Sequence, residues 1–193
     1  ALESGGRLPA SGLFGTISFY ALLVTVALFS IPYGAVETSH KSLLILFVSV
    51  IAGFRIIDSV NSRSFKVAEP LLLSPLFGIL GLAFIQIVQW PNAASAISVD
   101  PYETRSFILI FGALIVAAEL LFLYTTTALR LKCLIVLIIA VGVGSAVFGL
   151  LREFYSDSRS DLLAAHLFPE QGFAQFINRN HFALLIEITF GLL

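Results

Sequence analysis

The sequence of 193 residues contains little charge, one cysteine and no methionine. Charged residues make up 12% of it, whereas soluble domains carry about 25%, so an ordinary soluble domain is excluded. The single cysteine, Cys133, excludes an intrachain disulfide and a cysteine-based zinc site. Cys133 lies in an apolar run, where an inert buried thiol is expected. The net charge of −1 gives no reason to expect a nucleic-acid partner.

Several catalytic and binding motifs are also missing. The chain has no glycine-rich phosphate loop and no Gly-x-Ser-x-Gly elbow. It has no His-x-x-x-His or similar ligand spacing. His166 and the nearby Asp157, Asp161 and Glu170, together with His40, form only a weak case for a metal site. We therefore predict no metal and no cofactor.

Long apolar stretches dominate what remains. Hydrophobic residues make up 58% of the chain, and its mean hydropathy is +0.98. A helix needs about 20 apolar residues to cross a bilayer, and the sequence predicts an all-α, polytopic transmembrane bundle with five complete spans and the start of a sixth. The spans are expected at residues 13–33, 41–57, 71–90, 107–127 and 131–151, and the sixth begins at Phe182.

The expected organisation follows from these spans. A tail (1–12) precedes the five-span bundle (13–151), a polar loop with a short interfacial helix (152–180) follows, and residues 181–193 start the sixth helix. Basic residues favour the cytoplasmic side, and their distribution places the N-terminus there and the loop outside. The short sixth helix, and the lack of methionine even at position 1, predict a truncated chain.

Three details of the bundle carry further expectations. The span at 41–57 is the weakest, and Arg55 is expected to extend towards the membrane surface. Arg130 and Lys132 are expected in the tight turn before the fifth span. The fifth span carries small residues four apart, Gly142/Ala146 and Ser145/Gly149, which favour close helix packing. Packing within the bundle is preferred over a dimer interface.

Glu119 lies inside the fourth expected span, where a charged carboxylate costs several kcal/mol unless it is paired, protonated or facing water. It could contact a proton or a substrate. Alternatively, it is a structural carboxyl that is hydrogen-bonded to a neighbouring helix or lies closer to the interface. The structural alternative is favoured. Glu187, in the sixth helix, is a second acid inside the membrane.

Asn178, Arg179, Asn180 and His181 stand together where the polar loop meets the sixth helix. The arginine fork suits phosphate oxygens, and the free N–H groups of a helix start favour anions. The cluster can therefore form an anion-binding edge. Alternatively, Asn180 only caps the helix, Arg179 only anchors at lipid headgroups and His181 only bonds a loop carbonyl. The spacing does not decide between the two.

Three segments resemble those of a known family. Asn178-Arg179-Asn180-His181-Phe182-Ala183, followed by Glu187, looks like the "NRNHFA…E" signature of O-antigen ligase/polymerase-like membrane proteins. Residues 31–37 (IPYGAVE) resemble the end of the family's first span. Residues 98–105 (SVDPYETR) resemble its "S-x-D-P-Y-x-T-R" segment. Of the three segments, residues 178–183 match the family most specifically.

The resemblance implies a multi-pass protein of the bacterial inner membrane that acts in lipopolysaccharide or other surface-glycan assembly. Such a glycosyltransferase moves a glycan from an undecaprenyl-pyrophosphate carrier to an acceptor at the periplasmic face, without a metal. Arg179 would then meet pyrophosphate oxygens, Asn178, Asn180 and His181 would shape the pocket mouth, and Glu187 would brace a partner inside the bundle. Membrane lipid and the lipid-linked glycan are the implied partners.

The chain departs from the family in length. Family members have about twice as many spans, and the loop with their catalytic residues lies beyond the point where this sequence ends, so no catalytic residue is assigned. The expected function is the N-terminal part of such a transferase. The alternative is a non-catalytic membrane subunit that packs in a larger membrane complex with other subunits.

Overall fold

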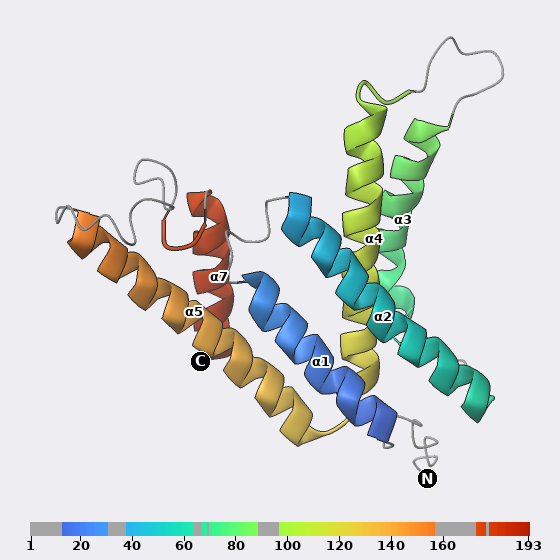
Figure 1. Ribbon diagram of the computed structural model, residues 1–193, viewed down its shortest axis with the longest axis horizontal. Coiled ribbons are helices and arrows are strands. Elements are labelled where there is room, and N and C mark those ends of the chain that lie inside the picture. Colours follow the sequence, from blue (N-terminus) through green and yellow to red (C-terminus); the bar gives the residue numbers. More distant parts are fainter. Residues whose placement is uncertain are drawn as a thin grey trace. The chain divides into compact units, whose positions relative to one another are not determined.

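The computed structural model describes residues 13–30, 38–63, 67–68, 70–88, 97–156, 173–176 and 178–193. These residues form six helices and no strand (Figure 1). The expected all-helical class is confirmed for this part of the chain. The helices are α1 (Leu13–Ser30), α2 (Thr38–Ser62), α3 (Pro70–Ile87), α4 (Pro101–Tyr124), α5 (Ala128–Ser156) and α7 (Arg179–Leu192).

Four of these helices, α2 to α5, are long and apolar enough to cross a membrane, and the apolar stretch Phe14–Ser30 of α1 is shorter. Most large apolar side chains on them are exposed, as expected for surfaces that contact lipid. The chain is therefore a membrane-embedded helical protein. The span at 41–57 was expected to be the weakest candidate for crossing a membrane. It corresponds to α2, which is one of the longest helices because it extends through Ser62 rather than ending near residue 57.

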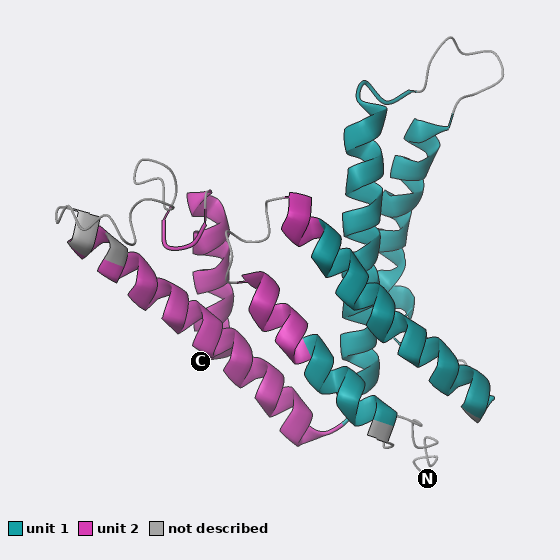
Figure 2. Cartoon of the chain, viewed as in Figure 1, with its two compact units in different colours: residues 1–22, 42–126 teal, residues 23–41, 127–193 magenta. Residues whose placement is uncertain are grey.

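The chain divides into two compact units (Figure 2). Unit 1 comprises Ala1–Leu22 and Ser42–Thr126, and unit 2 comprises Leu23–Lys41 and Thr127–Leu193. Helices α3 and α4 pack side by side in unit 1, and α5 and α7 pack together in unit 2.

Helix α4 begins six residues before the expected position, because Asp100 caps it. The Asp100 carboxylate accepts hydrogen bonds from the backbone N–H groups of Tyr102 (3.0 Å) and Glu103 (3.1 Å). Pro101 occupies the first helical position, where its missing N–H costs nothing.

Two expectations about basic residues are wrong. Arg130 and Lys132 belong to α5 itself, because Thr127 accepts a hydrogen bond from the Arg130 N–H (3.2 Å) and starts the helix there. Arg55 does not extend outward. It is buried, and its guanidinium lies 3.6 Å from the carboxylate of Asp58. The spacing of three residues brings the two side chains onto one face of α2, so Arg55 is paired within its own helix.

The small residues of α5 pack within unit 2, as expected. A Cβ added at Gly142 would lie 2.9 Å from Thr189 Cβ, and one added at Gly149 would lie 2.8 Å from Phe173 Cζ. Either distance is too short for a real contact. Both glycines are therefore required by the close approach of Thr189 and Phe173.

Candidate membrane-boundary site at the start of α7

Asn178 is the residue that caps α7. Its backbone is extended (φ −102°, ψ 119°), and its Oδ1 accepts a hydrogen bond from the Asn180 N–H at 2.9 Å. The helix begins at Arg179, two residues before the start expected at residue 181. The expectation that Asn180 caps the helix is wrong, because Asn178 occupies the position with non-helical backbone that a capping side chain requires.

A short turn holds the segment before α7 against α5. Phe173 and Phe176 exchange both backbone hydrogen bonds at 3.0 Å, and Ala174 between them adopts φ 54°. Ala174 is 1% exposed, so packing on all sides maintains this left-handed conformation. The rings of Phe173 and Phe182 lie 4.7 Å apart, which joins the turn to the first turns of α7.

Gln175 ties the same turn to two helices of unit 2. Its Nε2 donates to the Ser145 hydroxyl at 2.5 Å and to the Ser30 carbonyl, at the end of α1, at 3.4 Å. The Ser145 hydroxyl in turn donates to the Val141 carbonyl at 2.7 Å. Sequence reasoning missed Gln175. Ser145 was noted only for its small size, and 30 residues separate the two partners.

The contacts with α5 fix the register of α7 along α5. Gly142 faces Thr189, and Gly149 faces Phe173, whose ring contacts that of Phe182 in a tilted arrangement. Residue numbers along α5 therefore fall as residue numbers along α7 rise, which means that the two helices are antiparallel. Continuing this register places Arg179 near the level of residue 152, just beyond the apolar stretch Ala128–Leu151. The cluster thus lies beside the end of this apolar stretch.

Three side chains of the cluster have no polar partner among the residues that the structure describes. Arg179, Asn180 and His181 are all exposed. Within the described part of the chain, their side chains make no hydrogen bond or ion pair. Asn178, by contrast, is engaged in capping. An arginine beside the positive end of a helix is chemically suited to bind a phosphate group, and the free amide and imidazole can add hydrogen bonds.

The two asparagines are expected to differ in their effect on α7. Asn178→Ala removes the cap, and the first turn should lose about 1 kcal/mol of stability. Hydrogen exchange of residues 180–182, followed by mass spectrometry, measures this loss as faster deuteration. Asn180→Ala is the matched control and should leave the exchange rates unchanged. Equal effects of the two substitutions would contradict the assignment of the cap.

Glu119 is placed outside this cluster, in unit 1. Its Oε1 accepts a hydrogen bond from the Ala68 N–H at 2.6 Å, just before α3 begins. Glu119 lies five residues from the end of α4 at Tyr124, which is about 7.5 Å along the helix axis. The structural alternative is therefore supported: the carboxylate binds the backbone at the start of a neighbouring helix and lies near the end of its span. Its Oε2 has no partner among the described residues.

Substitution of Glu119 should separate its two roles. Glu119→Ala leaves the Ala68 N–H without its acceptor and should cost about 1–3 kcal/mol. Glu119→Gln keeps an acceptor oxygen and should retain most of the stability. Thermal unfolding in detergent compares the two variants. A functional defect in Glu119→Gln at unchanged stability would instead favour a role in proton or substrate contact.

The segment 98–105, which resembles a family motif, has a structural explanation. Besides the Asp100 cap, the hydroxyls of Ser98 and Thr104 lie 2.7 Å apart, and Thr104 donates to the Asp100 carbonyl at 2.9 Å. These bonds start α4. The side chains of Tyr102 and Arg105 are exposed and take no part in the cap.

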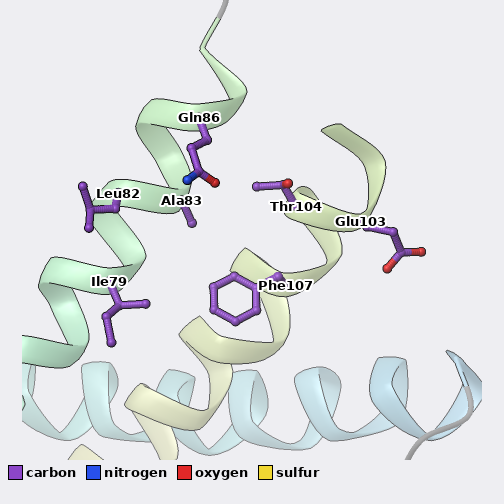
Figure 3. A pocket seen from close by; sticks show the side chains of 7 residues that line it. All are labelled: Ile79, Leu82, Ala83, Gln86, Glu103, Thr104 and Phe107. Atoms are coloured by element: carbon purple, nitrogen blue, oxygen red, sulfur yellow. The ribbon is translucent and has the colours of Figure 1, made fainter. Parts of the chain in front are cut away.

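A groove of about 550 Å³ lies between α3 and α4 in unit 1 (Figure 3). Gln86 and Thr104 face one another across it, while the Glu103 carboxylate points away from α3. Its other lining residues are apolar: Ile79, Leu82, Ala83 and Phe107. This surface suits contact with a lipid chain and offers no pair of catalytic groups.

Other expected features fall outside the described residues. They are the interfacial helix of the 152–180 loop, residues 31–37, and the group His166, Asp157, Asp161 and Glu170. Among the residues that the structure describes, no three His, Cys, Asp or Glu side chains are grouped as metal ligands.

Comparison of the chain with protein-family models, with curated proteins and with solved structures found no match.

Proposed function

We propose that the chain is the N-terminal part of an O-antigen ligase-like glycosyltransferase, with the start of α7 as the binding site for the pyrophosphate of a lipid-linked glycan. One observation carries the proposal. Arg179, Asn180 and His181 are exposed together at the positive end of a helix, beside the end of the apolar stretch of α5. The resemblance of residues 178–183 to the family signature supports the same function.

The proposed reaction displaces undecaprenyl pyrophosphate from the sugar. An acceptor hydroxyl attacks the anomeric carbon, a glycosidic bond forms, and the bond from that carbon to the pyrophosphate oxygen breaks. The leaving pyrophosphate gains negative charge, which the Arg179 guanidinium neutralises. We assign no residue of this chain as the base that accepts the hydroxyl proton.

The proposed topology has five spans and a cytoplasmic N-terminus in the bacterial inner membrane. It requires α1 to cross as well as α2 to α5. With α4 and α5 each crossing once, α4 and α7 both start on the same side of the membrane. The two family-like segments, 98–105 and 178–183, then both open towards the periplasm, where the lipid-linked glycan is presented.

A second candidate function is a non-catalytic subunit of a larger membrane complex. The observation that favours it is the outward position of Glu187 on α7. The small-residue face of α5 does not favour it, because Gly142 and Gly149 pack within unit 2.

Deletion of the coding sequence tests the proposed function. Cells without the protein should accumulate undecaprenyl-pyrophosphate-linked glycan and lose the glycan from its acceptor. Complementation with the wild-type protein should restore both. An unchanged acceptor and no accumulation of the carrier would contradict the assignment as a ligase.

A further inference from the structure

Glu187 lies on the face of α7 that points away from α5. The opposite face of the helix, which includes Phe182 and the buried Thr189, packs towards the turn 173–176 and α5. At 100° per residue, Glu187 lies about 160° around the helix from Thr189. Its side chain is exposed. Packing within unit 2 therefore does not cover this carboxylate.

The register with α5 places Glu187 deep in the apolar layer. Because Thr189 lies at Gly142, Glu187 lies near the level of Gly144. Gly144 is seven residues before Leu151, the end of the apolar stretch of α5. At 1.5 Å per residue, the Glu187 level is about 10 Å inside that boundary. Headgroups and bulk water are out of reach of a glutamate side chain at this depth.

An acid at this depth needs a partner. A carboxylate inside the bilayer costs several kcal/mol unless it is paired, protonated or facing water. Within unit 2, no described residue forms a hydrogen bond or an ion pair with the Glu187 side chain. Its neighbours on the same face, Ala183, Leu184 and Gly191, offer no polar side-chain group. The described residues of unit 2 therefore supply no donor to this carboxylate.

We propose that this face of α7 docks a transmembrane helix that carries an arginine or lysine at the level of Glu187. Charge complementarity selects a basic partner, because ion pairing offsets the cost of the buried carboxylate. Ala183 and Gly191 flank Glu187 on the face and permit close approach of a helix. The inference is independent of the proposed glycan transfer, because it depends only on the depth and exposure of Glu187.

Photo-cross-linking of the full protein in native membranes tests this docking. The photoreactive residue p-benzoylphenylalanine replaces Leu184, which is 57% exposed and lies one turn from Glu187. The cross-linked peptide should be an apolar segment that contains an arginine or lysine. Adding Glu187→Gln should lower the cross-linking yield about tenfold, which corresponds to 1.4 kcal/mol of association energy. The same probe at Val143, which is exposed on α5, is the matched control and should keep its yield in Glu187→Gln.

Two results would overturn the proposal. One is a cross-link at position 184 to lipid, or to a segment without a basic residue, with a yield that Glu187→Gln leaves unchanged. The other is rapid modification of Glu187 by dicyclohexylcarbodiimide in untreated membranes, because this reagent modifies protonated carboxyls that face lipid. Slow modification of Glu187 supports the ion pair. Loss of glycan transfer plays no part in either readout, so failure of the docking proposal is distinct from failure of the proposed function.

Discussion

Gly142→Ala destabilises the protein by about 1–3 kcal/mol, the usual cost of overpacking a tight core. The added methyl group would meet the hydroxyl, Cβ and Cγ2 of Thr189. Thr189 cannot easily move, because its side chain is β-branched and its hydroxyl donates to the Leu185 carbonyl at 2.8 Å. Helix α7 must therefore shift away from α5. The temperature of half-unfolding in detergent, followed by fluorescence-detected size exclusion, measures the loss.

Gly144→Ala is the matched control for this prediction. Gly144 lies in the same helix, and a Cβ added there would have no atom within 4 Å. Alanine in a helix interior is favoured over glycine by about 0.5–1 kcal/mol, so this variant should be as stable as the wild type or more so. Thr189→Ala should restore part of the stability of Gly142→Ala, because the two substitutions act on one contact. Equal unfolding temperatures for Gly142→Ala and Gly144→Ala would contradict the packing of α5 against α7.

Arg179→Ala in the complete protein should abolish glycan transfer while the protein still inserts in the membrane. Removing a group that stabilises transition-state charge typically lowers the rate by about 10²–10³. Arg179→Lys should retain part of the activity, because lysine keeps the charge but loses the planar fork of donors. Transfer of glycan from its undecaprenyl carrier to the acceptor, measured in isolated membranes, gives the rates.

Lys132→Ala is the control for a general loss of positive charge. Lys132 is exposed in the first turns of α5, at the end opposite the site. Transfer by this variant should equal that of the wild type. Near-normal transfer by Arg179→Ala would refute the role of Arg179, whatever the result for Lys132→Ala.

The apolar runs predicted the helices but not their ends. Residues 107–127 marked the fourth span by hydropathy alone, yet the helix starts at Pro101, because Asp100 and Pro101 form an N-terminal signal that overrides the lower hydropathy of the first turn. The same applies to α7, where Asn178 rather than Asn180 caps the helix. Both signals stand in the sequence, and capping chemistry rather than hydropathy identifies them.

Contacts between distant segments could not be predicted from one sequence. The hydrogen bond from Ala68 to Glu119 joins residues 51 apart, and that from Gln175 to Ser145 joins residues 30 apart. Each depends on how the helices pack, which local periodicity does not encode. The ion pair of Arg55 and Asp58 is different, because its spacing within one helix was visible in the sequence.

The sequence indicated the cluster of residues 178–181 but not the separate roles of its members. The position of these residues at the end of a polar loop predicts a place at the membrane boundary, and this remains a prediction. The structure adds that Asn178 serves the helix, while Arg179, Asn180 and His181 are exposed. It also adds the turn 173–176, whose Gln175 and Phe173 hold the start of α7 against α5.

Direct binding of the lipid carrier tests the central claim most closely. Native mass spectrometry of the purified full protein would compare retention of undecaprenyl pyrophosphate by the wild type and by Arg179→Ala, with undecaprenol as the uncharged control ligand. The account predicts that the wild type retains the pyrophosphate form preferentially and that Arg179→Ala loses this preference. Equal retention of both lipids by the wild type, or an undiminished preference in Arg179→Ala, would contradict a pyrophosphate site at the start of α7.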